Sequence, residues 1–142
     1  MSTGLQLGMV GLGRMGAGMV RRMMKDGIRC VGYDVNQDAV KSLEADGAIG
    51  ATSIEDFVSK LEKPRTTWMM LPVAFVDDTL EKISGHLEKG DIVIDGGNSY
   101  YKDDIRRAKH LRERTQRRMP PSRRRLVEEL LPQLAQVCLV RP

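Results

Sequence analysis

A glycine pattern near the N-terminus constrains this chain more than any other feature, because of what lies on either side of it. An apolar segment runs directly into the G-x-G-x-x-G pattern of residues 11–16, and a segment with apolar residues at helical spacing follows. At a strand-to-helix turn, such a pattern lets the backbone approach phosphate groups at the positive end of the helix. The pattern therefore predicts a parallel α/β sheet with a phosphate-binding turn after its first strand.

The chain as far as about residue 113 alternates short apolar runs with helical patterns. The apolar runs predict strands over Leu5–Val10, Ile28–Tyr33, Thr66–Leu71 and Asp91–Ile94. The helical patterns predict helices between them and a last helix over 101–113. This alternation is typical of βαβ units around a parallel sheet. We expect five strands in all, these four and one more whose range we do not assign, in a Rossmann-type, doubly wound sheet with the order 3-2-1-4-5.

An acidic residue at the end of the second expected strand bears on which dinucleotide would bind. Asp34 follows Gly11 by 23 positions (34 minus 11), close to the spacing at which a carboxylate accepts a hydrogen bond from the adenine ribose of NAD. The same carboxylate would repel the 2′-phosphate of NADP, and neighbouring Val35 and Asn36 carry no positive charge. The sequence favours NAD and leaves NADP as the alternative.

Composition excludes several other classes of protein. No apolar run reaches the 18 residues of a membrane span, and residues 1–13 lack the basic start and apolar block of a secretory signal. The two cysteines, Cys30 and Cys138, are too few for a disulfide framework or a cysteine metal site. His86 and His110 have no acidic or cysteine partner at ligand spacing. We therefore expect a cytoplasmic protein without a membrane partner, and assign no metal ligand and no catalytic residue.

The character of the chain changes at about residue 114. Residues 114–142 hold seven arginines and two glutamates, and all 14 glycines precede them. We divide the chain into a dinucleotide-binding domain, 1–113, and an Arg-rich tail, 114–142. The favoured interpretation of the tail is an out-of-frame or truncated end of a longer gene. The alternative is a basic arm for nucleic acid at Arg117–Arg118 and Arg123–Arg125, which the absence of an interleaved aromatic residue disfavours.

Four segments together resemble the N-terminal half of 6-phosphogluconate dehydrogenases: GMVGLGRMGAGMVRRM, YDVN, MMLPVA and IVIDGGNSYYKDDIRRA. The resemblance covers residues 5 to about 113, and the block from Asp95 to Asp104 is its most specific part. It implies an oxidoreductase of the pentose phosphate pathway that oxidises and decarboxylates 6-phosphogluconate to ribulose 5-phosphate, and a homo-oligomeric parent enzyme. An aspartate at the end of the second strand resembles the NAD-preferring branch of that family.

The resemblance also implies a set of binding residues. They match the family's phosphate loop, its ribose-contacting triplet, the turn bordering the adenosine and the nicotinamide ribose, and an asparagine that touches both cofactor and sugar-acid substrate. In that order they are Gly11, Leu12, Gly13, Arg14, Met15 and Gly16, then Asp34, Val35 and Asn36, then Leu71, Pro72 and Val73, and finally Asn98. An amide suits the last position because it can donate and accept hydrogen bonds at once.

The chain departs from the family pattern after Glu113. The family's sixth strand, its Ser-Gly-Gly loop and the helical domain with a lysine base and a glutamate acid have no recognisable counterpart. We therefore expect a chain that is inactive alone, with an exposed sheet edge and marginal stability. Two alternatives stay open. One is a fragment of a 3-hydroxyisobutyrate-type dehydrogenase, against which the GGNSYYKDD run argues, and the other is a non-catalytic dinucleotide- or nucleic-acid-binding module.

Overall fold

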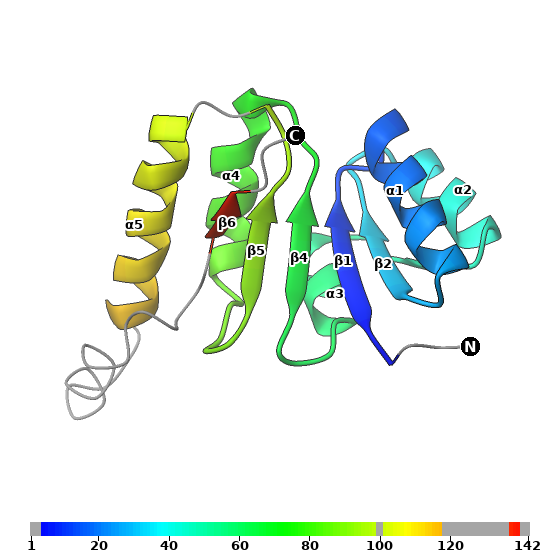
Figure 1. Ribbon diagram of the computed structural model, residues 1–142, viewed down its shortest axis with the longest axis horizontal. Helices are drawn as coiled ribbons and strands as arrows, with labels where there is room; N and C mark the ends of the chain where they lie inside the picture. Colours follow the sequence, from blue (N-terminus) through cyan, green and yellow to red (C-terminus); the bar gives the residue numbers. More distant parts are fainter. Residues whose placement is uncertain (1–3, 99–100, 118–136, 140–142) are drawn as a thin grey trace.

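The computed structural model describes residues 4–98, 101–117 and 137–139. They form a parallel sheet with the strand order β3-β2-β1-β4-β5-β6, flanked by helices (Figure 1). The strands are β1 (Gln6–Val10), β2 (Arg29–Tyr33), β3 (Ile49–Gly50), β4 (Thr66–Met69), β5 (Ile92–Asp95) and β6 (Val137–Leu139). The helices are α1 (Arg14–Lys25), α2 (Gln37–Ala45), α3 (Ile54–Ser59), α4 (Val73–Ser84) and α5 (Tyr101–Arg117).

Two apolar clusters, one on each face of the sheet, hold the helices in place. Neighbouring residues of the central strand β1 belong to different clusters, because successive side chains of a strand point to opposite faces. Met9 packs with α1 and α2 on one face, and Val10 packs with α3, α4 and Leu111 of α5 on the other. Both residues are buried, as expected for a parallel sheet covered on both sides.

The predicted doubly wound order 3-2-1-4-5 is confirmed, with element ends shifted by a few residues. One expectation was wrong: the sheet does not end at the fifth strand. β6 pairs in parallel with β5, with Val137 beside Val93 and Leu139 beside Asp95. An edge strand presents backbone N–H and C=O groups to any further extended segment, and a short apolar triplet can use them. Most of the Arg-rich tail lies outside the described residues, so the domain division at residue 113 and both interpretations of the tail stay predictions.

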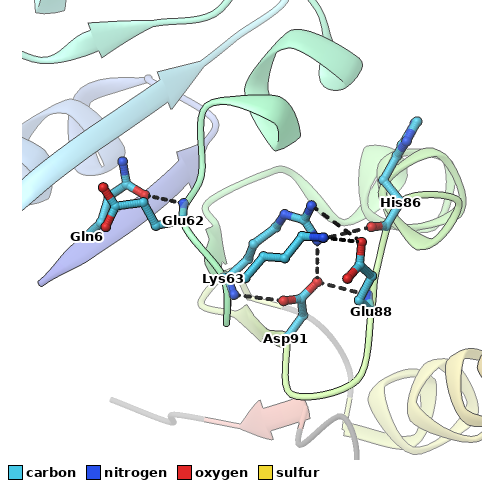
Figure 2. Close-up of polar contacts among 7 residues, drawn as sticks. Gln6, Glu62, Lys63, His86, Glu88 and Asp91 are labelled. Atoms are coloured by element: carbon cyan, nitrogen blue, oxygen red, sulfur yellow. Dashed lines mark hydrogen bonds and ion pairs between the residues drawn. The ribbon is translucent and has the colours of Figure 1, made fainter.

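A buried ion pair fixes the amino end of the sheet, away from the glycine turn. Arg65 precedes β4 and Asp91 precedes β5, and Arg65 Nη1 lies 2.9 Å from Asp91 Oδ2, with 10% and 1% of the side chains exposed. The backbone N–H groups of Arg65 and Glu88 also donate to the Asp91 carboxylate, at 2.7 and 2.9 Å. Figure 2 shows these contacts, together with the exposed Lys63–Glu88 pair beside them. Asp91 thus joins the loop after α4 to the starts of two strands.

We expect Asp91→Ala to lower the free energy of unfolding by about 3–5 kcal/mol, because it leaves the buried Arg65 guanidinium with only the more distant Glu88, at 3.9 Å, as counter-charge. Glu62→Ala is the control, since Glu62 pairs with Arg29 at 2.7 Å where both side chains are largely exposed. Its loss of stability should be much smaller, because an exposed ion pair contributes little in water. Urea unfolding followed by circular dichroism measures both, and equal losses would contradict a special role for the buried pair.

Candidate functional site

The turn after β1 has a shape that only glycine permits at two positions. Gly11 has a φ of 94°, and its N–H donates to the carbonyl oxygen of Tyr33 at 2.9 Å. A Cβ added to Gly11 would collide with the carbonyl oxygen of Met70, and one added to Gly16 would collide with the carbonyl oxygen of Gly11. The absence of side chains therefore lets β1, β4 and the first turn of α1 approach one another closely.

The start of α1 is suited to an anion. Gly13 is the N-cap residue, and it makes no side-chain cap hydrogen bond. The first turn of the helix carries no acidic residue. A Cβ on Gly13 would meet nothing within 4 Å, so the backbone there is open to close approach. The N–H groups and dipole of an uncapped helix start favour negative charge, and a pyrophosphate fits this position.

Asp34 connects the glycine turn to the end of β2. Its Oδ2 accepts a hydrogen bond from the Leu12 N–H at 2.7 Å, and its Oδ1 accepts one from the Asn36 N–H at 2.8 Å. Asn36 in turn caps α2, its side-chain oxygen accepting from the Asp38 N–H at 3.1 Å. Each carboxylate oxygen has a second lone pair, so Asp34 can still accept from a ribose hydroxyl. The sequence indicated the ribose contact but not the bond to Leu12.

A cleft of about 320 Å³ lies at the carboxyl ends of β1, β2 and β4. Six of the residues predicted from the sequence line it: Gly11, Gly13, Asp34, Val35, Leu71 and Pro72. The other lining residues, which the sequence analysis did not select, are Val10, Tyr33, Ile54, Met70, Phe75, Asp78, Thr79 and Lys82. The last four recur at helical spacing on one side of α4, and that spacing is the signal that could have found them.

The remaining predicted residues lie around the cleft rather than among its described lining. Leu12 is 4% exposed and packs in the core, so only its backbone can serve the site. Gly16 is buried beneath the turn. Four more of the predicted residues are exposed near the starts of α1, α2 and α4: Arg14, Met15, Asn36 and Val73.

Asn98 is exposed in the loop after β5, at the same carboxyl edge of the sheet. Two glycines bring this loop against its neighbours. A Cβ on Gly96 would collide with Trp68 Nε1, and one on Gly97 would lie 2.8 Å from the Leu71 carbonyl oxygen. The loop therefore packs against β4 and the turn that follows it, which places Asn98 beyond β4 from Asp34.

Neither histidine lies with catalytic or metal-binding partners. His86 belongs to the loop at the amino end of the sheet, and His110 pairs with Glu81 at 3.3 Å on the exposed side of α5. Among the residues that the structure describes, no group of three His, Cys, Asp or Glu side chains could hold a metal ion. No helix within that part of the chain has the length and apolar character needed to cross a membrane.

A doubly wound sheet, a glycine turn opening α1 and an aspartate after β2 together define a Rossmann-type dinucleotide-binding domain. The comparison with protein families specifies it further. Residues 6–119 match the model of the NAD binding domain of 6-phosphogluconate dehydrogenase. The chain belongs to this family, as the sequence resemblance predicted.

Individual proteins agree with this assignment. The NAD(+)-dependent, decarboxylating 6-phosphogluconate dehydrogenase of Haloferax volcanii is 40% identical over 105 residues, which are 73% of this chain and 35% of that protein. The structure of the Plasmodium falciparum 6-phosphogluconate dehydrogenase matches with a TM-score of 0.68 and 28% identity, over 78% of this chain and 25% of that one. A 3-hydroxyisobutyrate dehydrogenase of Salmonella typhimurium matches with the same TM-score and 26% identity, over 78% and 39%. The chain thus spans about a third or less of the length of these 6-phosphogluconate dehydrogenases.

Two glycines of α1 allow a matched test of the turn. Gly16→Ala should destabilise the fold by about 1–3 kcal/mol and abolish dinucleotide binding, because the new methyl group displaces the Gly11 carbonyl. Gly18→Ala, two residues along the same helix, should stabilise the fold by about 0.5–1 kcal/mol, because its Cβ meets nothing within 4 Å. Urea unfolding and calorimetric titration with NADH measure the two effects. Full NADH binding by the Gly16 variant would contradict the assigned role of the turn.

Proposed function

We propose that this chain is the cofactor-binding part of a 6-phosphogluconate dehydrogenase and that it binds NAD in preference to NADP. The observation that carries the proposal is the Asp34 carboxylate, which two backbone N–H groups hold at the wall of the cleft. The pyrophosphate would lie against the start of α1, and the adenine ribose against Asp34. Val35 and Leu71 would provide apolar walls on either side of the cleft.

The charge balance of the cleft supports the preference for NAD. Lys82 is the one cation among the residues described as lining the cleft, and its Nζ lies 2.7 Å from Asp78 Oδ2. Asp78 raises the pKa of Lys82 and neutralises its charge locally. Lys82 therefore does little to offset the repulsion between Asp34 and a 2′-phosphate, whereas the 2′-hydroxyl of NAD can donate a hydrogen bond to Asp34.

The proposed reaction is that of the complete enzyme. NAD would supply the acceptor for the hydride that leaves C3 of 6-phosphogluconate as the C3 hydroxyl loses its proton. The resulting 3-keto acid would lose CO₂ and take up a proton to give ribulose 5-phosphate. We propose Asn98 as a contact to both cofactor and substrate, because its exposed amide lies at the carboxyl edge of the sheet. We assign no proton-transfer residue among the described residues, and homo-oligomeric assembly stays a prediction.

The two alternative functions have weaker support. The likeness to a 3-hydroxyisobutyrate dehydrogenase extends over the fold that both families share, while the matching family model is that of 6-phosphogluconate dehydrogenase. The nucleic-acid alternative depends on arginines that lie mostly outside the described residues, and nothing in the described part of the chain favours it.

Parallel calorimetric titrations with NADH and NADPH test the proposal. The wild-type chain should bind NADH more tightly, and Asp34→Asn should reduce the ratio of the two affinities about tenfold by removing the like charge. Asp38→Asn is the control, because Asp38 is an exposed carboxylate in the first turn of α2 that is not among the cleft residues. The ratio of NADH to NADPH affinity in Asp38→Asn should equal that of the wild type. Tighter NADPH binding by the wild type would overturn the preference, and no binding of either would overturn the proposed function.

A further inference from the structure

Arg107 of α5 is a buried cation that touches two other elements. Its Nε donates to Asp77 Oδ1 of α4 at 2.7 Å, and its Nη1 lies 3.6 Å from Asp95 Oδ2 at the end of β5. Only 5% of the Arg107 side chain and 4% of the Asp95 side chain are exposed. Arg107, together with neighbouring Arg106, holds the pKa of Asp77 below its ordinary value, as expected for a charged pair in contact.

Asp95 connects Arg107 to the loop that carries Asn98. While Oδ2 faces the guanidinium, Oδ1 accepts a hydrogen bond from the Gly97 N–H at 3.0 Å. The two oxygens belong to one rigid carboxylate, so a shift of Asp95 toward or away from Arg107 also moves its bond to Gly97. Because Gly97 packs directly on the Leu71 carbonyl, the loop has little room to adjust separately.

This loop and the adenosine half of the proposed site lie at the same carboxyl edge of the sheet, but over different strands. Asp34 follows β2, the glycine turn follows β1, and the strand order then continues through β4 to β5. An extended dinucleotide with its adenine ribose at Asp34 and its pyrophosphate at α1 must therefore direct its other half over the ends of β4 and β5. The loop at residues 96–98 is placed to meet the nicotinamide ribose or ring.

We propose that Arg107 is a positioning residue for the nicotinamide half of the cofactor, acting through Asp95 and the 96–98 loop. The inference rests on the proposed function, since it assumes that a dinucleotide occupies the cleft. Arginine suits this role because its planar guanidinium presents separate N–H groups to two carboxylates at once. The single ammonium of lysine cannot bridge the same two carboxylates with the same geometry.

The neighbouring residue supplies a matched control. Arg106 Nη2 lies 3.0 Å from Asp77 Oδ2, so Arg106 shares one partner with Arg107. Its side chain is 59% exposed, and it makes no contact with Asp95 among the described interactions. Arg106→Lys and Arg107→Lys therefore differ chiefly in whether they disturb the end of β5.

The test compares two probes, ADP-ribose and NADH, on the full chain and its variants by calorimetric titration. ADP-ribose carries the adenosine, the pyrophosphate and the second ribose but lacks the nicotinamide. Trp68, the chain's single tryptophan, lies beside Gly96, so energy transfer from Trp68 to the reduced nicotinamide gives a second readout of where that ring lies. Thermal melting checks that each variant is folded.

We expect Arg107→Lys to weaken NADH binding about tenfold and to reduce energy transfer from Trp68, with ADP-ribose affinity unchanged. Arg106→Lys should change neither affinity. Equal weakening of both probes by Arg107→Lys, or unchanged NADH binding, would overturn the inference while leaving the proposed function intact. Failure of the wild-type chain to bind either probe would overturn the proposed function and this inference with it.

A second variant keeps the inference testable if Arg107→Lys does not fold. Asp77 is 53% exposed, so Asp77→Asn should fold, and it removes the charge that holds Arg107 on the side of α4. We expect a smaller loss of NADH affinity, about threefold, again without a change for ADP-ribose. An unchanged NADH affinity in a folded Asp77→Asn chain would count against Arg107 as a positioning residue.

Discussion

The hydrogen bond from the Leu12 N–H to Asp34 is the contact on which the candidate site depends. It joins the turn after β1 to the segment after β2, and the same carboxylate holds Asn36, which begins α2. Glycines at Gly11, Gly13 and Gly16 give this turn no side chains at those positions, and Leu12 anchors it by packing into the core. The Asp34 carboxylate, from the segment after a neighbouring strand, adds the polar contact that fixes the turn, and the proposed cofactor preference rests on the same group.

The two ends of the sheet use charge in opposite ways. At the amino end, Arg65 and Asp91 are buried together, and the surrounding backbone N–H groups use the lone pairs that remain. That arrangement commits the Asp91 carboxylate to contacts within the protein, which fix the loop after α4. At the carboxyl end, polar groups follow several strands and face a cleft, as is general for doubly wound sheets. Stability and binding thus fall on opposite edges of the same strands.

The sequence predicted the strand order and the glycine turn because both depend on local patterns of apolar residues and glycines. It did not predict β6, since a Val-Cys-Leu triplet is too short for a periodic signal and pairs only because β5 offers an edge. The α4 wall of the cleft was also missed. Phe75 and Lys82 are seven positions apart, so helical spacing places them on one side of α4. The packing of α4 against the sheet shows that this side faces the cleft.

The two carboxylates at the strand ends differ in their charge balance, and the proposed cofactor preference depends on that difference. Asp34 and Asp95 each accept a backbone N–H of a nearby loop, so both fix loop geometry. Asp95 also faces the buried Arg107, which offsets part of its charge, whereas no described cation pairs with Asp34. In the proposed binding mode, Asp95 would contribute shape to the nicotinamide side, while Asp34 would place a negative charge without a described counter-ion beside the adenine ribose. Only at Asp34 would the sign of the charge then distinguish a 2′-hydroxyl from a 2′-phosphate.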